Sequence, residues 1–320
     1  MTSRRSNERG FTLIELMIAT AIMGIVTSQV FMVLSAQKRV YISNERVLDV
    51  QEDTRTVVDL ISFDARMAGF MVPEVSAVSS FDGGAANGDS LCISDSSYFD
   101  FPSGTDLSDG LDTQSDHFAA STVAVLGGAS ATLTTLDIDG DNGPDDFGAP
   151  GRGIILSDGV RSHCARITGT VGNTISFAPN VPNPALYTTA NTRAVPAVIY
   201  ELDQPTLTLT RNGLTLATGV EDLQVEYWVD NAPQNGVIDG ANEFPVDDLN
   251  NPPGAATMDT TAIRRVRVSV ITRTDQTEGG YKQQIDTGRR PGSANRVQAA
   301  QADSFRRRRF TTSVLPRNLL

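Results

Sequence analysis

The sequence has few residues of the kinds that build metal centres and disulfide-rich scaffolds. Its 320 residues include two cysteines, two histidines and one tryptophan. These numbers are too small for a four-cysteine zinc site, an iron–sulfur cluster or a framework of several disulfides. The G-x-S-x-G, H-E-x-x-H and C-x-x-C motifs of common enzyme classes are also absent. We therefore expect that the protein is not an enzyme.

Positive charge is scarce in the middle of the chain. Residues 68–260 contain 26 acidic and 5 basic side chains, whereas residues 261–320 contain 13 basic and 4 acidic ones. An acidic region of this size excludes nucleic acid as a partner, because such binding depends on cations that meet phosphates. We expect the arginines of the last segment to lie on exposed strand faces and to offset the acidic body.

The N-terminus contains the one long apolar segment that we find. Residues 11–34 contain a single ionisable side chain, Glu15. As a helix, 24 residues span about 36 Å, which is enough to cross a bilayer. The preceding segment is short and basic, so we expect a single-pass inner-membrane protein with a cytoplasmic N-terminus and its bulk outside the cytoplasm. An intramembrane Glu is costly and indicates a functional role.

The junction between the basic and apolar segments reads Gly10-Phe11-Thr12-Leu13-Ile14-Glu15-Leu16. It resembles the processing site of type IV prepilins and pseudopilins. The resemblance implies that a prepilin peptidase cuts between Gly10 and Phe11 and methylates the new amino group of Phe11. It also implies that Glu15 pairs with the Phe11 ammonium of a neighbouring subunit during assembly. The Phe11 ammonium of the same chain is a competing partner, and the sequence does not choose between them.

The apolar segment continues into a charged, amphipathic one. Apolar residues recur at helical spacing up to Ile61, and Gly69 and Pro73 then predict the end of the helix. We therefore expect one helix over residues 11–68. The predicted organisation is a cleaved leader (1–10), a transmembrane or filament-core helix (11–37), its amphipathic second half (38–69) and a β-rich head (70–320).

The head has the pattern of short antiparallel strands. Thr206–Thr210 and Leu214–Leu216 flank Asn212-Gly213, a strong hairpin signal. Residues 82–116 and 231–262 are rich in Gly, Pro, Asp and Asn, and we predict that both are long loops. The predicted fold class is α+β: a pilin-like fold in which the long helix packs on an antiparallel sheet. Further strands are predicted at residues 123–126, 132–136, 154–157, 165–171, 175–177, 195–200, 223–229, 264–272 and 309–315.

Three segments resemble one branch of the pilin superfamily. Asp59–Phe70, Gly219–Tyr227 and Arg309–Asn318 are similar to the helix end, a late strand and the last strand of PilW-like minor pilins. The resemblance implies a subunit that primes pilus assembly in or near the tip complex and then lies at the cell surface. Its partners would be other minor pilins, the major pilin, the inner-membrane assembly platform and a larger tip adhesin. The alternatives are a J-type minor pseudopilin of type II secretion and an adhesive tip module.

One acidic segment has the composition of a calcium site. Asp137, Asp139, Asp141 and Asp145 supply hard oxygen ligands close together, as calcium requires. The alternative is a solvated acidic turn, because Asn142 and Gly148 occupy positions where an EF-hand loop has Gly and Glu. The segment 230–239 is a weaker candidate of the same kind.

The two cysteines, Cys92 and Cys164, both fall in the part predicted to lie outside the cytoplasm. Disulfides persist there, so we predict a bridge between them; the alternative is two buried thiols. His163 precedes Cys164, but a single His beside a Cys fits an ordinary strand residue better than a catalytic or metal site.

Overall fold

A computed structural model gives the structure of the chain. It describes residues 11–69, 72, 76–83, 87–94, 120–138, 147, 150–188, 190–230, 246, 263–275 and 305–316. The chain divides into two compact units, Met1–Asp49 and Val50–Leu320. The boundary falls within a single long helix, and each unit is described by itself below.

Helix α1 spans Leu13–Met67, in agreement with the predicted helix over residues 11–68. Its last turn is followed by Gly69, which has a φ of 88° and ends the helix as expected. From Val50 onward, α1 buries one stripe of side chains in the second unit. These buried residues are Thr54, Val57, Ile61, Ser62 and Ala65.

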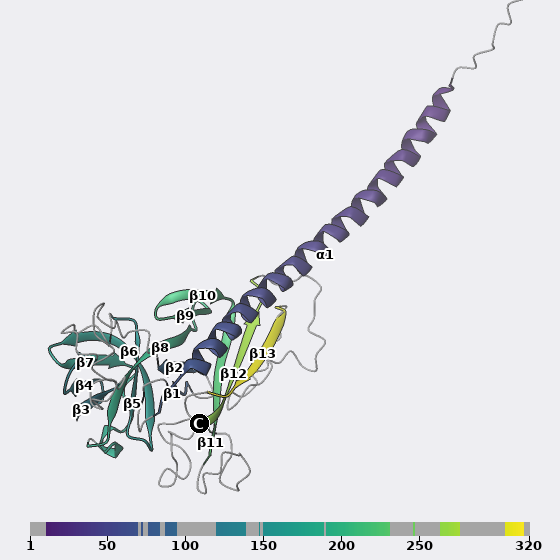
Figure 1. The fold of residues 1–320 in the computed structure, drawn as a ribbon. Helices are drawn as coiled ribbons and strands as arrows, with labels where there is room; N and C mark the ends of the chain where they lie inside the picture. The colour runs from purple at the N-terminus through teal and green to yellow at the C-terminus, as the bar shows by residue number, and fades with distance from the viewer. Residues whose placement is uncertain are drawn as a thin grey trace, which may run out of the picture. The chain divides into compact units, whose positions relative to one another are not determined.

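A three-stranded antiparallel sheet packs against that stripe. Its strands are β11 (Val220–Val229), β12 (Ile263–Arg273) and β13 (Arg307–Val314), in the order β11-β12-β13. Every second residue faces the helix, so Val266, Val268 and Val270 lie in one core with Val57 and Ile61. This is the helix-on-sheet arrangement predicted for the fold class (Figure 1).

A second sheet closes partly on itself. The pairings run β8-β3-β4-β7-β6-β5 and return from β5 to β8, all antiparallel, which makes a closed six-stranded barrel. Figure 1 shows these strands gathered together, apart from β11–β13. The strands are β3 (Ser121–Leu126), β4 (Ser130–Leu133), β5 (Gly153–Ser157), β6 (Ser162–Val171), β7 (Thr174–Ala178) and β8 (Arg193–Asp203).

The barrel interior is filled by side chains from all six strands. It holds Val123, Leu133, Ile154, Ile167 and Phe177 among its buried residues. A barrel of this size has room for side chains and none for a channel. Strand β5 is buried on both faces: Ile154 and Leu156 point into the barrel, while Ile155 belongs to a separate small core outside it.

Strand β8 is shared with a flanking set of strands. Its second half pairs with β2 (Ser90–Ser94) on one side and β9 (Thr208–Arg211) on the other. Beyond these lie β1 (Val78–Phe81) and β10 (Leu214–Thr218). Asn212 and Gly213 both have positive φ in the β9–β10 turn, so the Asn-Gly hairpin prediction is confirmed.

Two expectations about the head need correction. The predicted loop over residues 82–116 contains strand β2, in which Leu91, Cys92 and Ile93 are buried between two serines. The strand expected at 132–136 lies instead at Ser130–Leu133, because residues 127–129 make a tighter turn than expected. Of the predicted loop 231–262, Val246 is described and pairs with Tyr227; the rest lies outside the described residues.

Candidate functional site

The first turn of α1 is closed by the two polar residues of the predicted processing motif. Thr12 N and Thr12 Oγ1 both donate to Glu15 Oε2, each at 2.9 Å, and Glu15 N donates to Thr12 Oγ1 at 3.4 Å. Thr12 is the N-cap and Glu15 the third helical residue, so the pair forms a capping box. The carboxylate thereby satisfies backbone groups that would otherwise be unpaired in an apolar environment.

This geometry adds a third partner to the two considered for Glu15. Oε2 is used by Thr12 of the same chain, while Oε1 makes no hydrogen bond within the described residues. A carboxylate accepts several hydrogen bonds at once, so capping and pairing with a Phe11 ammonium are compatible. Phe11 is almost fully exposed, and Gly10 lies outside the described residues.

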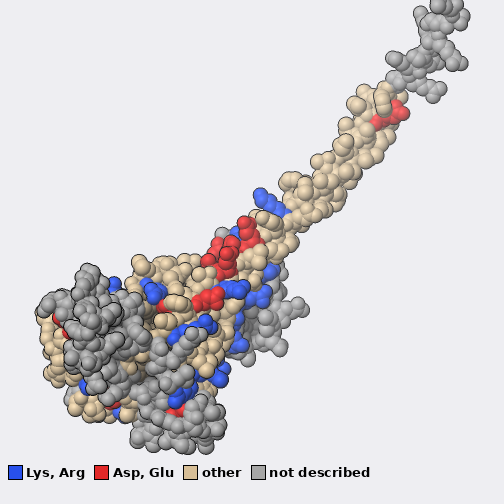
Figure 2. All heavy atoms as spheres, in the orientation of Figure 1, with Lys and Arg blue, Asp and Glu red and all other residues tan. Residues whose placement is uncertain are grey.

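The first unit leaves its apolar side chains exposed. From Leu13 to Leu34 the large hydrophobic residues are all more than half exposed, and Figure 2 shows this stretch nearly free of charge. By length and composition, the helix that contains them could cross a membrane. Such exposure is unfavourable in water, so this segment needs lipid or other helices around it.

In the second unit, the end of α1 is fixed to both sheets by polar contacts. Tyr200 Oη donates to Asp64 Oδ2 at 2.5 Å, and Arg211 Nε donates to the same oxygen at 3.0 Å. Burial and the hydrogen bond to the Asp64 carboxylate raise the pKa of Tyr200. On the other side, Thr54 Oγ1 bonds to Thr272 and Ser62 Oγ to Thr312. These contacts fix the rotation of the helix about its axis.

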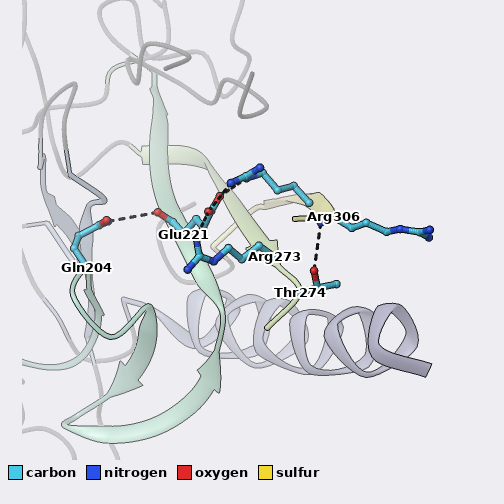
Figure 3. A network of polar contacts seen from close by, with 6 residues as sticks. Gln204, Glu221, Arg273, Thr274 and Arg306 are labelled. Atoms are coloured by element: carbon cyan, nitrogen blue, oxygen red, sulfur yellow. Dashed lines mark hydrogen bonds and ion pairs between the residues drawn. The ribbon is translucent and has the colours of Figure 1, made fainter. Parts of the chain in front are cut away.

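A buried ion cluster joins the three strands of the smaller sheet. Glu221 on β11 accepts two hydrogen bonds from Arg307 on β13, at 2.6 and 3.0 Å, and one from Arg273 on β12, at 3.2 Å. The side chains of Glu221 and Arg307 have no exposed surface. Figure 3 shows Arg273 and Gln204 on either side of Glu221, and Gln204 Nε2 lies 3.5 Å from the Glu221 carbonyl oxygen.

Asp89 connects the edge of β11 to the strands beside the barrel. Its amide donates to the Leu223 carbonyl at 2.8 Å, and its Oδ2 accepts from Val225 N at 2.8 Å. Oδ1 accepts from Gly83 N at 3.2 Å. Burial raises the pKa of Asp89 to about 8, against the two backbone hydrogen bonds, which lower it. Asp89 thus occupies the position of a neighbouring strand along β11.

The structure joins Cys92 and Cys164 by a disulfide, with the Cα atoms 5.5 Å apart. Cys92 is on β2 and Cys164 on β6, so the bond connects the flanking strands to the barrel. Both residues are fully buried in the small core that contains Ile155. His163 points the other way: its Nε2 lies 3.0 Å from the Pro179 carbonyl oxygen, and its ring makes an edge contact with Phe81.

The proposed calcium ligands are mostly outside the described residues. Asp137 is described, whereas Asp139, Asp141 and Asp145 are not, and neither is the segment 231–239 of the weaker candidate. Among the described residues, no group of three His, Cys, Asp or Glu is placed to hold a metal ion. Calcium binding stays a prediction; calorimetry with calcium on the full chain in detergent tests it, and an absence of heat would exclude it.

Sequence reasoning missed several residues of these clusters, but not all were hidden. The capping role of Thr12 could have been predicted from the sequence, because Thr-x-x-Glu before an apolar helix is the capping-box pattern. Asp64, Asp89 and Glu221 could not be identified in this way. Apart from Gly83 beside Asp89, the partners of these carboxylates lie 52 to 147 residues away in the chain, and no local pattern marks a buried carboxylate.

Comparisons with protein families match the two ends of the chain. Residues 5–28 match the prokaryotic N-terminal methylation motif, and residues 180–318 match the family of type IV pilus-assembly protein W. The chain is therefore similar to type IV prepilins at its N-terminus and to PilW-type pilus-assembly proteins over its C-terminal part. Pilin-family proteins are structural subunits and are not typically enzymes. The PilW-type segment includes β8–β13 and hence Glu221, Arg273 and Arg307. The two matches leave residues 29–179, with most of the barrel, between them.

Comparisons with curated proteins and with solved structures add no further evidence for a family. No curated protein matches this chain. Among solved structures, the type IV-like pilin TTHA1219 from Thermus thermophilus aligns over 84% of this chain and 98% of that chain, with 10% identity and a TM-score of 0.33. A likeness at that level carries no argument, so the fold class rests on the helix and antiparallel sheets described above.

Proposed function

We propose that the protein is a minor type IV pilin that primes pilus assembly and lies in or near the tip complex. The observation that carries the proposal is the pair of family matches at the two ends of one chain, a methylation motif and a PilW-type segment. Helix α1, Leu13–Met67, begins within the matched methylation motif and belongs to the expected architecture.

The N-terminal geometry supports a specific mechanism. A prepilin peptidase cuts between Gly10 and Phe11 and methylates the new amino group. The Glu15 carboxylate, already ordered by Thr12 at 2.9 Å, then accepts the ammonium of a neighbouring Phe11 through Oε1. A charge pair in lipid lowers the cost of both charges and fixes the axial register of the two helices. Before assembly, the protein stays in the inner membrane through α1.

The contacts at the end of α1 support a role as a template. Asp64, Thr54 and Ser62 each bond to a strand, so the helix cannot turn about its axis relative to the sheets within this unit. A fixed helix presents the same side chains to each incoming subunit. The partners of this step are other minor pilins, the major pilin and the inner-membrane assembly platform.

The size of the head supports a position at the tip. The closed barrel adds a separately packed core to the helix-and-sheet unit. A subunit that repeats along a filament has to pack its head at every turn, whereas a terminal subunit does not. A tip position also gives access to a larger adhesin.

A gene deletion with two readouts tests the proposal. Surface pili and secreted enzymes are measured in the same strain, with complementation by wild type and by Glu15→Ala. Lost pili with normal secretion, restored by wild type alone, is the expected result. Normal pili with proteins trapped in the periplasm would instead identify a minor pseudopilin. If both are normal, adhesion is the function to test, and the assembly proposal is wrong. Immunogold labelling of sheared pili locates the subunit, and label along the whole fibre would contradict a tip position.

A further inference from the structure

The apolar part of α1 is bounded by a charge at each end. Residues 16–37 contain no Asp, Glu, Lys or Arg, and they lie between Glu15 on one side and the pair Lys38 and Arg39 on the other. Figure 2 shows this stretch in tan, between red atoms at one end and blue atoms at the other. All of it belongs to the first unit, Met1–Asp49, so one continuous helix sets the spacing of these charges.

The distance between the two charged ends fits a bilayer. At about 1.5 Å per residue, Glu15 and Lys38 are about 35 Å apart along the helix axis. The hydrocarbon core of a bilayer is about 30 Å thick, and an average helix tilt of about 20° shortens the distance across it by only about 2 Å. Glu15 and Lys38 can therefore lie in opposite headgroup regions at the same time, with only uncharged residues in the hydrocarbon between them.

The cations at the end of this stretch are available for contacts with lipid. Lys38 and Arg39 are both exposed, and neither forms an ion pair within the described residues. Arg39 Nε donates to the Ser35 carbonyl oxygen at 3.3 Å, which leaves the other guanidinium donors unused by that bond. Tyr41, close by on the helix, is 68% exposed, and tyrosine is enriched at membrane–water interfaces. We term Lys38, Arg39 and Tyr41 the α1 collar.

We propose that the α1 collar binds the phosphates of lipid headgroups at the periplasmic surface of the inner membrane and so fixes the depth of the helix before assembly. Ammonium and guanidinium groups bind phosphate oxygens strongly. With the collar at that surface, Glu15 lies in the cytoplasmic headgroup region. A shift toward the cytoplasm would bring the collar into hydrocarbon, and a shift outward would bring Glu15 into it. Both shifts are unfavourable, so the helix has one preferred depth.

This depth indicates when the pairing of Glu15 is needed. While the chain stays in the membrane, the Glu15 carboxylate is hydrated at the surface and needs no counterion. When the chain is drawn outward into a pilus, the carboxylate enters the hydrocarbon, where the ammonium of a neighbouring Phe11 offsets its cost. That step rests on the proposed function, whereas the depth itself requires only that α1 spans the membrane.

Cysteine labelling measures the depth of the helix on the full chain. The chain is expressed in cells without pilus or pseudopilus assembly proteins, so that it stays in the inner membrane, and a membrane-impermeant maleimide is added to the periplasmic side. Ala36→Cys and Val40→Cys introduce thiols at exposed positions on either side of the two cations. The native cysteines, Cys92 and Cys164, are joined and do not react. We expect Val40→Cys to react at least about fivefold faster than Ala36→Cys, which lies on the hydrocarbon side.

Two double variants identify the role of the cations. Lys38→Gln with Arg39→Gln removes both charges, so the helix should sink toward the cytoplasm and labelling of Val40→Cys should slow about fivefold. Lys38→Glu with Arg39→Glu places anions beside the phosphates, so the helix should move outward and labelling of Ala36→Cys should quicken about fivefold.

A matched control removes two cations elsewhere on α1. Arg55→Gln with Arg66→Gln changes two exposed residues of the second unit and should leave both labelling rates unchanged. Unchanged protein level and an intact Cys92–Cys164 bond verify that each variant folds.

Three outcomes decide the matter. Labelling of Val40→Cys that does not slow when both charges are lost would overturn the proposal, because the helix then keeps its depth without the collar. Wild-type labelling in the Lys38→Glu, Arg39→Glu variant would also overturn it, because a charge of either sign would then suffice. The expected labelling pattern, in a chain whose deletion leaves pili normal, would keep the proposed depth and reject the proposed function.

Discussion

The N-terminal part of α1 exposes its large apolar side chains, whereas the barrel buries side chains of the same kinds. Between Leu13 and Leu34 the large apolar residues are exposed, whereas the barrel encloses Ile154, Ile167 and Phe177 almost completely. Burial of apolar surface is the main favourable term in folding. The barrel therefore obtains its stability within the chain, while the helix obtains it from lipid or from other subunits.

This difference separates assembly from folding. A substitution in the first unit should alter what the protein joins without altering the stability of the head. A substitution in the head clusters should alter stability in the absence of any partner. The following predictions test that division.

The largest effect is expected at Glu15. Glu15→Gln retains an oxygen that can accept from Thr12 but removes the charge, so it separates capping from pairing. We expect pilus number to fall by tenfold or more, with cleavage at Gly10–Phe11 unchanged. Electron microscopy counts the pili, and immunoblotting follows cleavage. Wild-type pilus numbers in Glu15→Gln would show that capping alone is what Glu15 provides.

Loss of the buried cluster should affect the head strongly. Glu221→Gln leaves the buried guanidinium of Arg307 without its anion, which we expect to cost about 3–5 kcal/mol of unfolding free energy. Glu201→Gln is a matched control, because its pair with Arg166 is partly exposed and is worth about 0–1 kcal/mol. Urea unfolding of the full chain in detergent measures both. Equal losses in the two variants would mean that burial does not decide the strength of these pairs.

The disulfide should have a somewhat smaller effect. The Cys92–Cys164 bond spans 72 residues and connects the flanking strands to the barrel. Replacing both cysteines by serine should cost about 2–4 kcal/mol and separate the unfolding of the barrel from that of the helix-and-sheet core. Thiol counting on the denatured exported protein comes first. Two free sulfhydryls would show that the bond does not form in the cell.

The same division explains what could be predicted from the sequence. The prepilin motif, α1 and strands such as Arg264–Thr272 depend on local patterns and were predicted close to their observed bounds. The barrel was not, because its closure depends on pairings such as β5 with β8, which are distant in the chain. Strand β5, Gly-Ile-Ile-Leu-Ser, is buried on both faces. Its sequence therefore lacks the alternation of apolar and polar residues that would show which side chains point inward.

Site residues follow the same rule. Gly10, Phe11 and Glu15 lie in one contiguous motif and were predicted from it. Glu221 and Asp64 act through partners on other strands, and a strand sequence does not distinguish a buried carboxylate from an exposed one. Residues 29–179, which neither family match covers, contain most of what the sequence left unpredicted.

A further effect in the head depends on pH. Folding raises the pKa of Asp89 from 3.8 to about 8, so between these values the folded chain keeps a proton that the unfolded chain loses. The contribution of Asp89 to stability is therefore greatest below pH 4 and declines, by up to about 1.4 kcal/mol per pH unit, until pH 8. Asp89→Asn should remove this slope, at a constant cost from the weakened bond to Gly83 or Val225. Urea unfolding at pH 5, 7 and 9 compares the two chains. Parallel pH profiles would mean that Asp89 is ionised in the folded head and that its two backbone hydrogen bonds outweigh its burial.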